Sequence, residues 1–189
     1  MAEDRHSVLV VTKDSKISSM VRAMLVPPMF DLSVASDFNE ARRRCVDQFF
    51  NIILVDYCEG EGADFAIDIS SSTSAILLLA PMSNFDQISY KVEGYGILTM
   101  TNPFDQFYFY NMVKVAIAFQ YKMSVLSSQA TKLKVKMDEI KIVSRAKMLL
   151  MQNLSMTEEQ AHHYIEKEAM DRGEKKLNIA NGIIRTYGN

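Results

Sequence analysis

The stretch Asn51–Asp56, which reads NIILVD, indicates the fold of the first part of the chain. Its four consecutive apolar residues, three of them β-branched, are typical of a strand that is buried on both faces, as in a parallel sheet. Asp56 ends the run with a carboxylate. Because ligands bind at the carboxyl ends of the strands in such sheets, this end of the strand is a candidate functional site.

Four further apolar runs and several amphipathic segments alternate around this stretch. The runs that predict strands are Ser7–Val11, Phe30–Ala35, Ala75–Leu79 and Gly96–Met100. The segments that predict helices are Ser15–Leu25, Phe38–Gln48, Phe85–Val92 and Asp105–Tyr121. After the third strand the pattern indicates a flexible loop at Ser70–Ser74. This alternation predicts an α/β fold, a doubly wound five-stranded parallel sheet with helices on both faces.

The composition is that of an ordinary folded protein. Of the 189 residues, 48% are hydrophobic and 23% are charged, which argues against extensive disorder. The sequence contains no run of about 18 apolar residues, the length needed to cross a membrane. The acidic start lacks the basic region of a secretory signal. Cys45 and Cys58 do not form a disulfide or zinc motif, and the adjacent His162 and His163 would point about 100° apart on a helix. We therefore expect a cytoplasmic protein that has no metal or other cofactor and does not contact a membrane.

Charge is distributed unevenly along the chain. Residues 1–121 contain 9 Lys and Arg against 15 Asp and Glu, whereas residues 122–189 contain 12 against 8. An acidic first part and a basic second part favour two units, at 1–121 and 122–189, and any polyanion would bind the second. The alternative is that the basic residues of the second part form an ordinary solvated helix surface.

After Tyr121 the strand pattern ends and a heptad pattern begins. Apolar residues alternate by three and four positions, as the a and d positions of a coiled coil do. They are Met123, Leu126, Ala130, Leu133, Met137 and Ile140. From Val143 the apolar stripe moves to another face. We therefore expect the helix to pair with that of a second copy over 123–140 and then to pack in a local bundle. The alternative is a long helix that folds back on its own domain.

Two shorter helices complete the predicted second part. Thr157 and Gln160 have the spacing of a capping box, which predicts the start of a helix. Gly173 predicts the end of that helix, and Lys176–Tyr187 is a further amphipathic segment. The second part is thus expected to be three helices, of which the first is very long.

Residues 6–121 resemble the receiver domain of response regulators. The resemblance rests on VLVVTKD at 8–14, NIILVD at 51–56, ILLLAP at 76–81 and GILTMTNPF at 96–104. It implies the receiver fold and places Asp56 at the position of the phospho-acceptor. In that family an acidic pair and the acceptor hold Mg²⁺, while a hydroxyl group and a lysine bind the phosphoryl group.

Four positions of this site differ from the family pattern. They are Thr12 and Lys13 at the acidic pair, Leu79 at the hydroxyl position and Asn102 at the lysine. Phosphoryl transfer to a carboxylate needs a cation at the attacked oxygen and donors for the phosphoryl oxygens. We therefore predict a degenerate receiver in which Asp56 is a remnant and Lys13 lies near it and neutralises it. Asp14 is expected to cap the next helix.

Residues 124–187 resemble the ANTAR domain, an RNA-binding antitermination module that follows receivers in bacterial regulators. The resemblance rests on RAK at 145–147, MLLM at 148–151, LSMTEEQA at 154–161, EAMDR at 168–172 and KKLNIA at 175–180. Met148 stands where the family usually has Gly, and His162 stands where it usually has a bulky apolar residue. The resemblance implies binding to hairpins of a nascent transcript, which prevents a terminator from forming.

The residues that we expect to bind RNA form two clusters. Cations are needed for the phosphates, and flat or amide side chains for unstacked bases. The first cluster is Arg145, Lys147, Gln152 and Asn153, and the second is Arg172, Lys175 and Lys176. We expect both to face the same side of a three-helix bundle. The alternative for Lys147 is a side chain that only covers apolar surface.

Together these patterns predict a dimeric regulator without enzymatic activity that binds two RNA hairpins, one for each subunit. A sensor protein or a ligand at the first domain, rather than a phosphoryl group, would control it. Two alternatives stay open. One is a conventional response regulator that is phosphorylated at Asp56, and the other is a protein-interaction module without an RNA partner.

Overall fold

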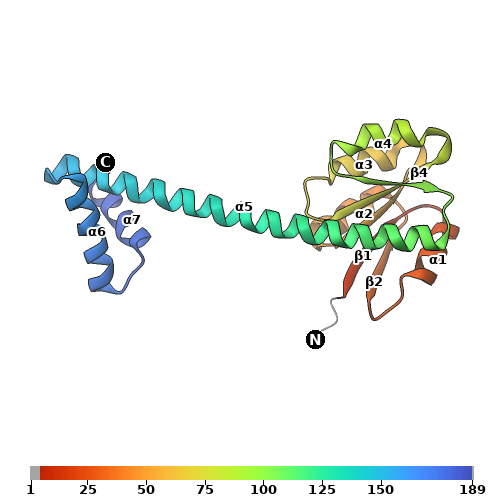
Figure 1. Cartoon of the computed structure of the whole chain (residues 1–189), viewed down its shortest axis with the longest axis horizontal. Helices are drawn as coiled ribbons and strands as arrows, with labels where there is room; N and C mark the ends of the chain where they lie inside the picture. The colour runs from red at the N-terminus through yellow and green to blue at the C-terminus, as the bar shows by residue number, and fades with distance from the viewer. Residues whose placement is uncertain (1–4, 189) are drawn as a thin grey trace. The chain divides into compact units, whose positions relative to one another are not determined.

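The computed structural model describes residues 5–188, and it confirms the predicted fold class. Five parallel strands form one sheet in the order β2-β1-β3-β4-β5 (Figure 1). The strands are β1 (His6–Val11), β2 (Phe30–Ala35), β3 (Ile52–Asp56), β4 (Ala75–Pro81) and β5 (Leu98–Asn102). The register aligns Asp56 with Leu79 and Pro81 with Asn102, so these residues meet at the carboxyl edge of the sheet.

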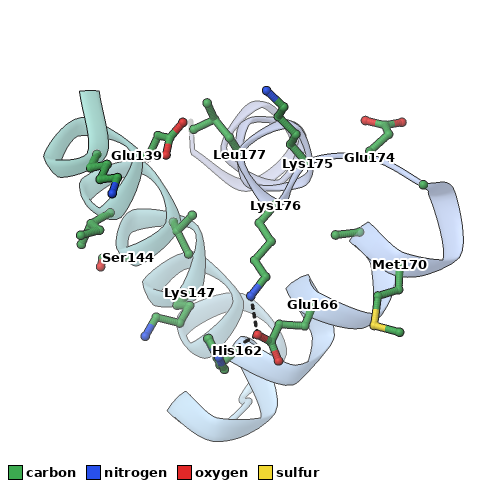
Figure 2. A pocket seen from close by; sticks show the side chains of 15 residues that line it. Glu139, Ser144, Lys147, His162, Glu166, Met170, Glu174, Lys175, Lys176 and Leu177 are labelled. Atoms are coloured by element: carbon green, nitrogen blue, oxygen red, sulfur yellow. Dashed lines mark hydrogen bonds and ion pairs between the residues drawn. The ribbon is translucent and has the colours of Figure 1, made fainter. Parts of the chain in front are cut away.

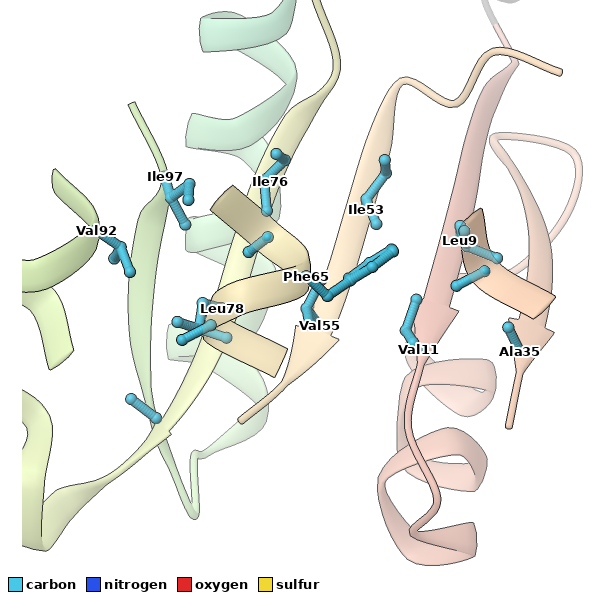
Figure 3. Packing of buried hydrophobic residues seen from close by; sticks show 14 of the residues in the cluster. Leu9, Val11, Ala35, Ile53, Val55, Phe65, Ile76, Leu78, Val92 and Ile97 are labelled. Atoms are coloured by element: carbon cyan, nitrogen blue, oxygen red, sulfur yellow. The ribbon is translucent and has the colours of Figure 1, made fainter. Parts of the chain in front are cut away.

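Helices cover both faces of the sheet, and each face has its own core because successive strand residues point to opposite sides. On one face, α2 (Phe38–Asp47), α3 (Glu61–Asp68) and α4 (Phe85–Glu93) cover residues such as Leu9 and Val55, with Phe65 of α3 at the centre (Figure 3). On the other face, α1 (Ser15–Met24) and the first turns of α5 (Gln106–Leu154) cover residues such as Val10 and Leu54.

Helix α3 was not predicted. Its sequence, EGADFAID, is short and contains a glycine, and neither feature favours a helix in isolation. It forms because Ala63, Phe65 and Ala66 are fully buried against the sheet. Tertiary packing therefore overrides the weak local preference. The loop at Ser70–Ser74 follows α3, and β5 begins two residues later than expected because Gly96, with φ of 70°, still belongs to the preceding turn.

Helix α5 is continuous over the segments that the sequence treats as two helices. It runs from Gln106 to Leu154, 49 residues in all. Contacts divide the chain into two compact units, and the division falls between Ser127 and Ser128 within α5. The boundary at 121/122 stays a prediction.

The second unit contains the last part of α5 together with α6 (Glu158–Arg172) and α7 (Lys176–Tyr187). The predicted caps of α6 are confirmed. Thr157 and Gln160 form a capping box, and Gly173 ends the helix in the left-handed conformation. The small core of this unit lies between the three helices, and its fully buried members are Ala146, Leu150, Ala161, Ile165 and Ala180. Among residues 5–188, no helix has the length and apolar character needed to cross a membrane.

Candidate functional site

At the carboxyl edge of the sheet, the Asp56 carboxylate is held by a threonine. Thr12, which is 5% exposed, donates a hydrogen bond from its Oγ1 to Oδ2 of Asp56 at 2.9 Å. The backbone N–H of Asp14 in turn donates to Thr12 Oγ1 at 3.0 Å. Thr12 therefore sits between the end of β1 and Asp56 and satisfies one oxygen of the carboxylate.

A small pocket of about 310 Å³ opens beside Asp56. Its lining residues are Asp56, Tyr57, Cys58, Glu59, Leu79, Pro81 and Asn102. The structure thus brings Leu79 and Asn102 to Asp56, as the sequence predicts from the strand ends. Leu79 is buried and apolar and offers no side-chain donor. Its backbone oxygen accepts a hydrogen bond from the N–H of Tyr57 at 3.0 Å.

The sequence analysis did not single out Cys58 as part of this site. Cys58 and Glu59 have positive φ values of 43° and 55°, so the chain turns sharply directly after β3. The pKa of the Cys58 thiol is raised, first by burial and then by the negative charge of Asp56, and the thiol also hydrogen-bonds the Asp56 side chain. This thiol is therefore less reactive than an ordinary cysteine at neutral pH.

Among residues 5–188, the ion pair recorded for Lys13 is with Glu61 and not with Asp56, so its expected neutralisation of Asp56 stays a prediction. The Lys13 ammonium points to α3, where its Nζ lies 3.4 Å from Oε2 of Glu61, and both side chains are mostly exposed. Asp14, by contrast, caps α1 as predicted, because its Oδ1 accepts a hydrogen bond from the N–H of Lys16 at 2.7 Å.

The residues around Asp56 do not fit Mg²⁺. This ion prefers oxygen ligands that include one or two carboxylates, but Thr12 and Lys13 replace the acidic pair, and the Asp14 carboxylate is engaged in capping α1. Over the described range 5–188, no group of three or more His, Cys, Asp or Glu side chains could hold a metal ion. Thr12 instead places a neutral hydroxyl donor against the Asp56 carboxylate.

The second unit contains a groove of about 1130 Å³, open to solvent, between its three helices (Figure 2). Its lining residues are Lys136, Glu139, Ile140, Val143, Ser144 and Lys147 from α5, His162, Glu166, Ala169 and Met170 from α6, and Gly173, Glu174, Lys175, Lys176 and Leu177 from the following turn and α7. The lining combines apolar side chains such as Val143 and Leu177 with charged side chains from all three helices, which we call the rim.

Two glutamates hold lysines of this rim. Lys147 Nζ lies 2.7 Å from Oε1 of Glu158 at the start of α6, and the Lys147 side chain is only 19% exposed. Lys176 pairs with Glu166, which His162 also approaches, at 3.3 Å from its Nε2 (Figure 2). The hydrogen bond and charge of Lys147 lower the pKa of Glu158. Lys176 and then His162 lower the pKa of Glu166. Both glutamates are therefore ionised partners of groove cations.

The structure brings together three of the seven predicted RNA-binding residues. Lys147, Lys175 and Lys176 line the groove, whereas Arg145, Gln152, Asn153 and Arg172 are not among its lining residues. Arg145 and Lys147 flank the fully buried Ala146 and so lie on opposite sides of α5.

The four residues outside the groove have other surroundings. Two of them make local contacts, and the other two share an exposed side of α5. Asn153 donates its Nδ2 to the backbone oxygen of Leu149, and Arg172 pairs with Glu168 at 2.7 Å. Gln152 lies seven residues after Arg145 and hence on the same side of the helix.

Several groove residues were missed by the sequence analysis, above all His162, Glu166 and Glu139. The helical spacing of Lys136, Ile140, Val143 and Lys147 could have indicated that one side of α5 faces the groove. The contributions of α6 and α7 could not be found in this way, because they depend on how the three helices pack.

The predicted dimer seam is exposed throughout. The exposed fractions are 37% for Met123, 47% for Leu126, 62% for Leu133, 53% for Met137 and 65% for Ile140, and Ala130 is also exposed. The seam is therefore largely open to solvent within the described part of one chain, with Ile140 also lining the groove, and its pairing with a second copy stays a prediction.

Both units are similar to parts of known proteins. Residues 131–184 match the ANTAR domain. The first unit is similar to NtrX from Brucella abortus, with a TM-score of 0.59 and 15% identity over 66% of this chain and 29% of that one. It is also similar to the receiver domain of an HD domain-containing protein from Pseudomonas fluorescens Pf-5, with a TM-score of 0.58 and 16% identity over 65% and 93%. At these identities the likeness shows the fold alone.

The chain therefore combines a unit that has the receiver fold with a second unit in which residues 131–184 match the ANTAR domain. It is similar to the transcriptional regulatory protein PdtaR of Mycobacterium tuberculosis, with 26% identity over 129 residues, which are 68% of this chain and 63% of PdtaR. It is also similar to the nitrate regulatory protein of Klebsiella oxytoca, with 34% identity over 64 residues, 34% of this chain and 16% of that protein. The matches thus span less than two thirds of each relative's length.

Proposed function

We propose that this chain is an RNA-binding transcription antitermination regulator. The observation that carries the proposal is the groove of the ANTAR unit, where Lys147, Lys175 and Lys176 come from two helices to one rim. Cations on a rim suit phosphates, and apolar side chains in the lining suit the face of an unstacked base. The regulatory names of the two relatives support the same function.

The proposed mechanism is occupancy and requires no catalysis. A hairpin that is bound in the groove cannot refold into a terminator, so transcription continues. Because the heptad seam of α5 is exposed, we propose that two copies pair along it and bind two hairpins, one for each subunit. This arrangement would raise the effective concentration of the second hairpin once the first is bound.

We further propose that phosphorylation does not control the first unit. The proposal rests on Thr12, which donates to the Asp56 carboxylate, and on Leu79 and Asn102, which replace the hydroxyl and the lysine of the family pattern. Control would come from a ligand or a sensor protein. Incubation with acetyl phosphate and Mg²⁺ is expected to leave the intact mass unchanged. An adduct of one phosphoryl group that is absent from Asp56→Asn would contradict this part of the proposal.

The RNA-binding function is tested by fluorescence anisotropy with a labelled leader RNA that carries two hairpins, titrated at several salt concentrations. We expect specific binding that weakens as salt increases, because phosphate contacts release counterions. The double variant Lys175→Gln/Lys176→Gln is expected to bind about tenfold more weakly and with a shallower salt dependence.

The matched control is Lys167→Gln. Lys167 is exposed on α6, but it is not among the groove residues. This variant loses one positive charge outside the groove, against two in the double variant, and is expected to bind like the unaltered protein. If the folded protein does not bind the RNA, or if the control weakens binding as much as the double variant, the function is that of a protein-interaction module instead.

A further inference from the structure

The heptad seam of α5 has an unusual charge pattern along its two flanks. With Met123 at position a and Leu126 at position d, the flanking e and g positions that carry charge are all lysines: Lys122 and Lys136 at g, and Lys134 and Lys141 at e. No acidic residue stands at an e or g position between 122 and 141. The acids of this stretch, Asp138 and Glu139, stand at the b and c positions, away from the seam.

These lysines are available for contacts with other molecules. Lys122, Lys134, Lys136 and Lys141 are all exposed. Within residues 5–188, an ion pair is recorded for one of these four lysines: Lys141 Nζ lies 3.6 Å from Oδ1 of Asp138. Both side chains of this pair are more than half exposed. Such a pair contributes little and does not cancel the charge of the flank.

In a parallel pair of helices, a g residue lies beside the e residue five positions later in the partner. Lys136 of one copy would thus lie beside Lys141 of the other, and the symmetry of the dimer repeats this contact. Like charges at e and g positions oppose pairing. The apolar seam therefore favours association of two copies, whereas its flanks oppose association unless an anion lies between them.

We propose that two copies pair along this seam when a polyanion bridges Lys136 of one copy and Lys141 of the other, so that the paired helices form a phosphate-binding site that neither copy has alone. This inference rests on the proposed function, since a leader RNA with two hairpins would supply both the bridging phosphates and the second copy. Binding of RNA and pairing of α5 are then one coupled equilibrium.

The site differs from the groove described above in its composition. It needs one lysine from each of two copies, and it recognises phosphate without reading a base. Lys136 also lines the groove, so a nucleic acid strand that leaves the groove along α5 would meet a lysine that belongs to both sites.

The test is analytical ultracentrifugation of the full chain at low and high salt and with a polyphosphate of defined length as the probe. We expect the unaltered protein to be mostly monomeric at low salt and to dimerise on addition of either salt or polyphosphate. The charge-reversal variant Lys141→Glu places a glutamate beside Lys136 of the other copy. It is expected to dimerise about tenfold more tightly at low salt without any anion.

Two further variants make the test specific. In Lys136→Glu/Lys141→Glu the like charges return with the opposite sign, so dimerisation at low salt is expected to weaken again and polyphosphate is expected to have no effect. Lys132→Glu changes the same charge at the outward-facing c position and is expected to behave like the unaltered protein. Equal dimerisation of the unaltered protein and Lys141→Glu at low salt, or a monomer under all conditions, would overturn the proposal.

The polyphosphate experiment separates this proposal from the RNA-binding function. Polyphosphate-driven dimerisation together with a failure to bind hairpin RNA would support the shared site and reject the antitermination function. Binding of hairpin RNA by a protein whose association ignores salt, polyphosphate and Lys141→Glu would do the reverse.

Discussion

The Asp56 carboxylate accepts a hydrogen bond at 2.9 Å from Thr12, which stands at one position of the family's acidic pair. The Cys58 thiol, in the turn after β3, lies beside the same carboxylate. Burial, followed by the negative charge of Asp56, raises the pKa of this thiol. A cation that entered this site would have to displace the hydrogen bond from Thr12 and would not meet the acidic pair of the family pattern, since Thr12 and Lys13 stand there. The residues at four positions, Thr12, Lys13, Leu79 and Asn102, thus account for the chemical difference between this site and the family's phosphorylation site.

The turn after Asp56 depends on a glycine in α3. A Cβ atom at Gly62 would lie 1.9 Å from the backbone oxygen of Asp56, so the backbone must move in Gly62→Ala. We expect this variant to lose at least about 2 kcal/mol of unfolding free energy, measured by denaturant unfolding of the full chain. Gly94→Ala is the control, since a Cβ there has nothing within 4 Å. Equal stability of the two variants would show that the close approach is absent.

If the groove binds RNA as proposed, Glu158 and Glu166 compete with the RNA for the lysines that they pair with. In Glu158→Gln the charge that holds Lys147 is lost, and the lysine becomes free to contact a phosphate. We therefore expect RNA binding to become about two- to fivefold tighter. Glu159→Gln changes the same charge at the neighbouring position, where no ion pair is recorded in the described residues. If both variants bind RNA alike, Lys147 does not contact the RNA and serves only to tie α5 to α6.

We expect the stability of α6 to depend on pH, because its residues Glu158 and Glu166 are each paired with a lysine. Lys147 lowers the pKa of Glu158, and Lys176 lowers that of Glu166. A pKa that is lower in the folded than in the unfolded chain stabilises the fold above the ordinary glutamate value, and this contribution is lost as the pH falls through the folded value.

We therefore expect the protection factors of the backbone amides in α6 and α7, which are corrected for the intrinsic exchange rate at each pH, to fall on acidification below the ordinary glutamate range. The double variant Glu158→Gln/Glu166→Gln is expected to show a smaller change with pH, because a glutamine side chain has no proton to gain in this pH range. An unchanged pH dependence in the double variant would mean that these two ion pairs do not link α6 to α5 and α7 in solution.

The strands and the caps of α6 can be predicted from the sequence because their signals are local. A buried run such as Ile52–Val55 and a capping box such as Thr157 with Gln160 depend on neighbouring residues only. Helix α3 could not be predicted, since it forms through burial of Phe65 against the sheet. The same limit applies to the candidate site: Lys147 could be nominated from its motif, but its partner Glu158 and the groove depend on packing between helices.

The chain as a whole combines a unit that has the receiver fold with an ANTAR unit, and one continuous helix belongs to both. The first turns of α5, with Phe109, Val113 and Ala116, pack on the sheet. The exposed seam begins at Met123, and the last part of the helix contributes one wall of the groove. A change in the pairing of α5 would therefore act on residues of both units. This offers a route by which a ligand or a sensor protein at the first unit could influence RNA binding without a phosphoryl group.

The central claim is that the groove of the ANTAR unit binds leader RNA. The most direct measurement is ultraviolet crosslinking in cells that express the protein from its own gene, followed by sequencing of the bound RNA, for the unaltered protein and for Lys175→Gln/Lys176→Gln. We predict that the recovered RNA maps to leaders with paired hairpins upstream of a terminator and that the double variant loses these reads. Crosslinks that are absent from the unaltered protein, or that persist in the double variant, would contradict the claim.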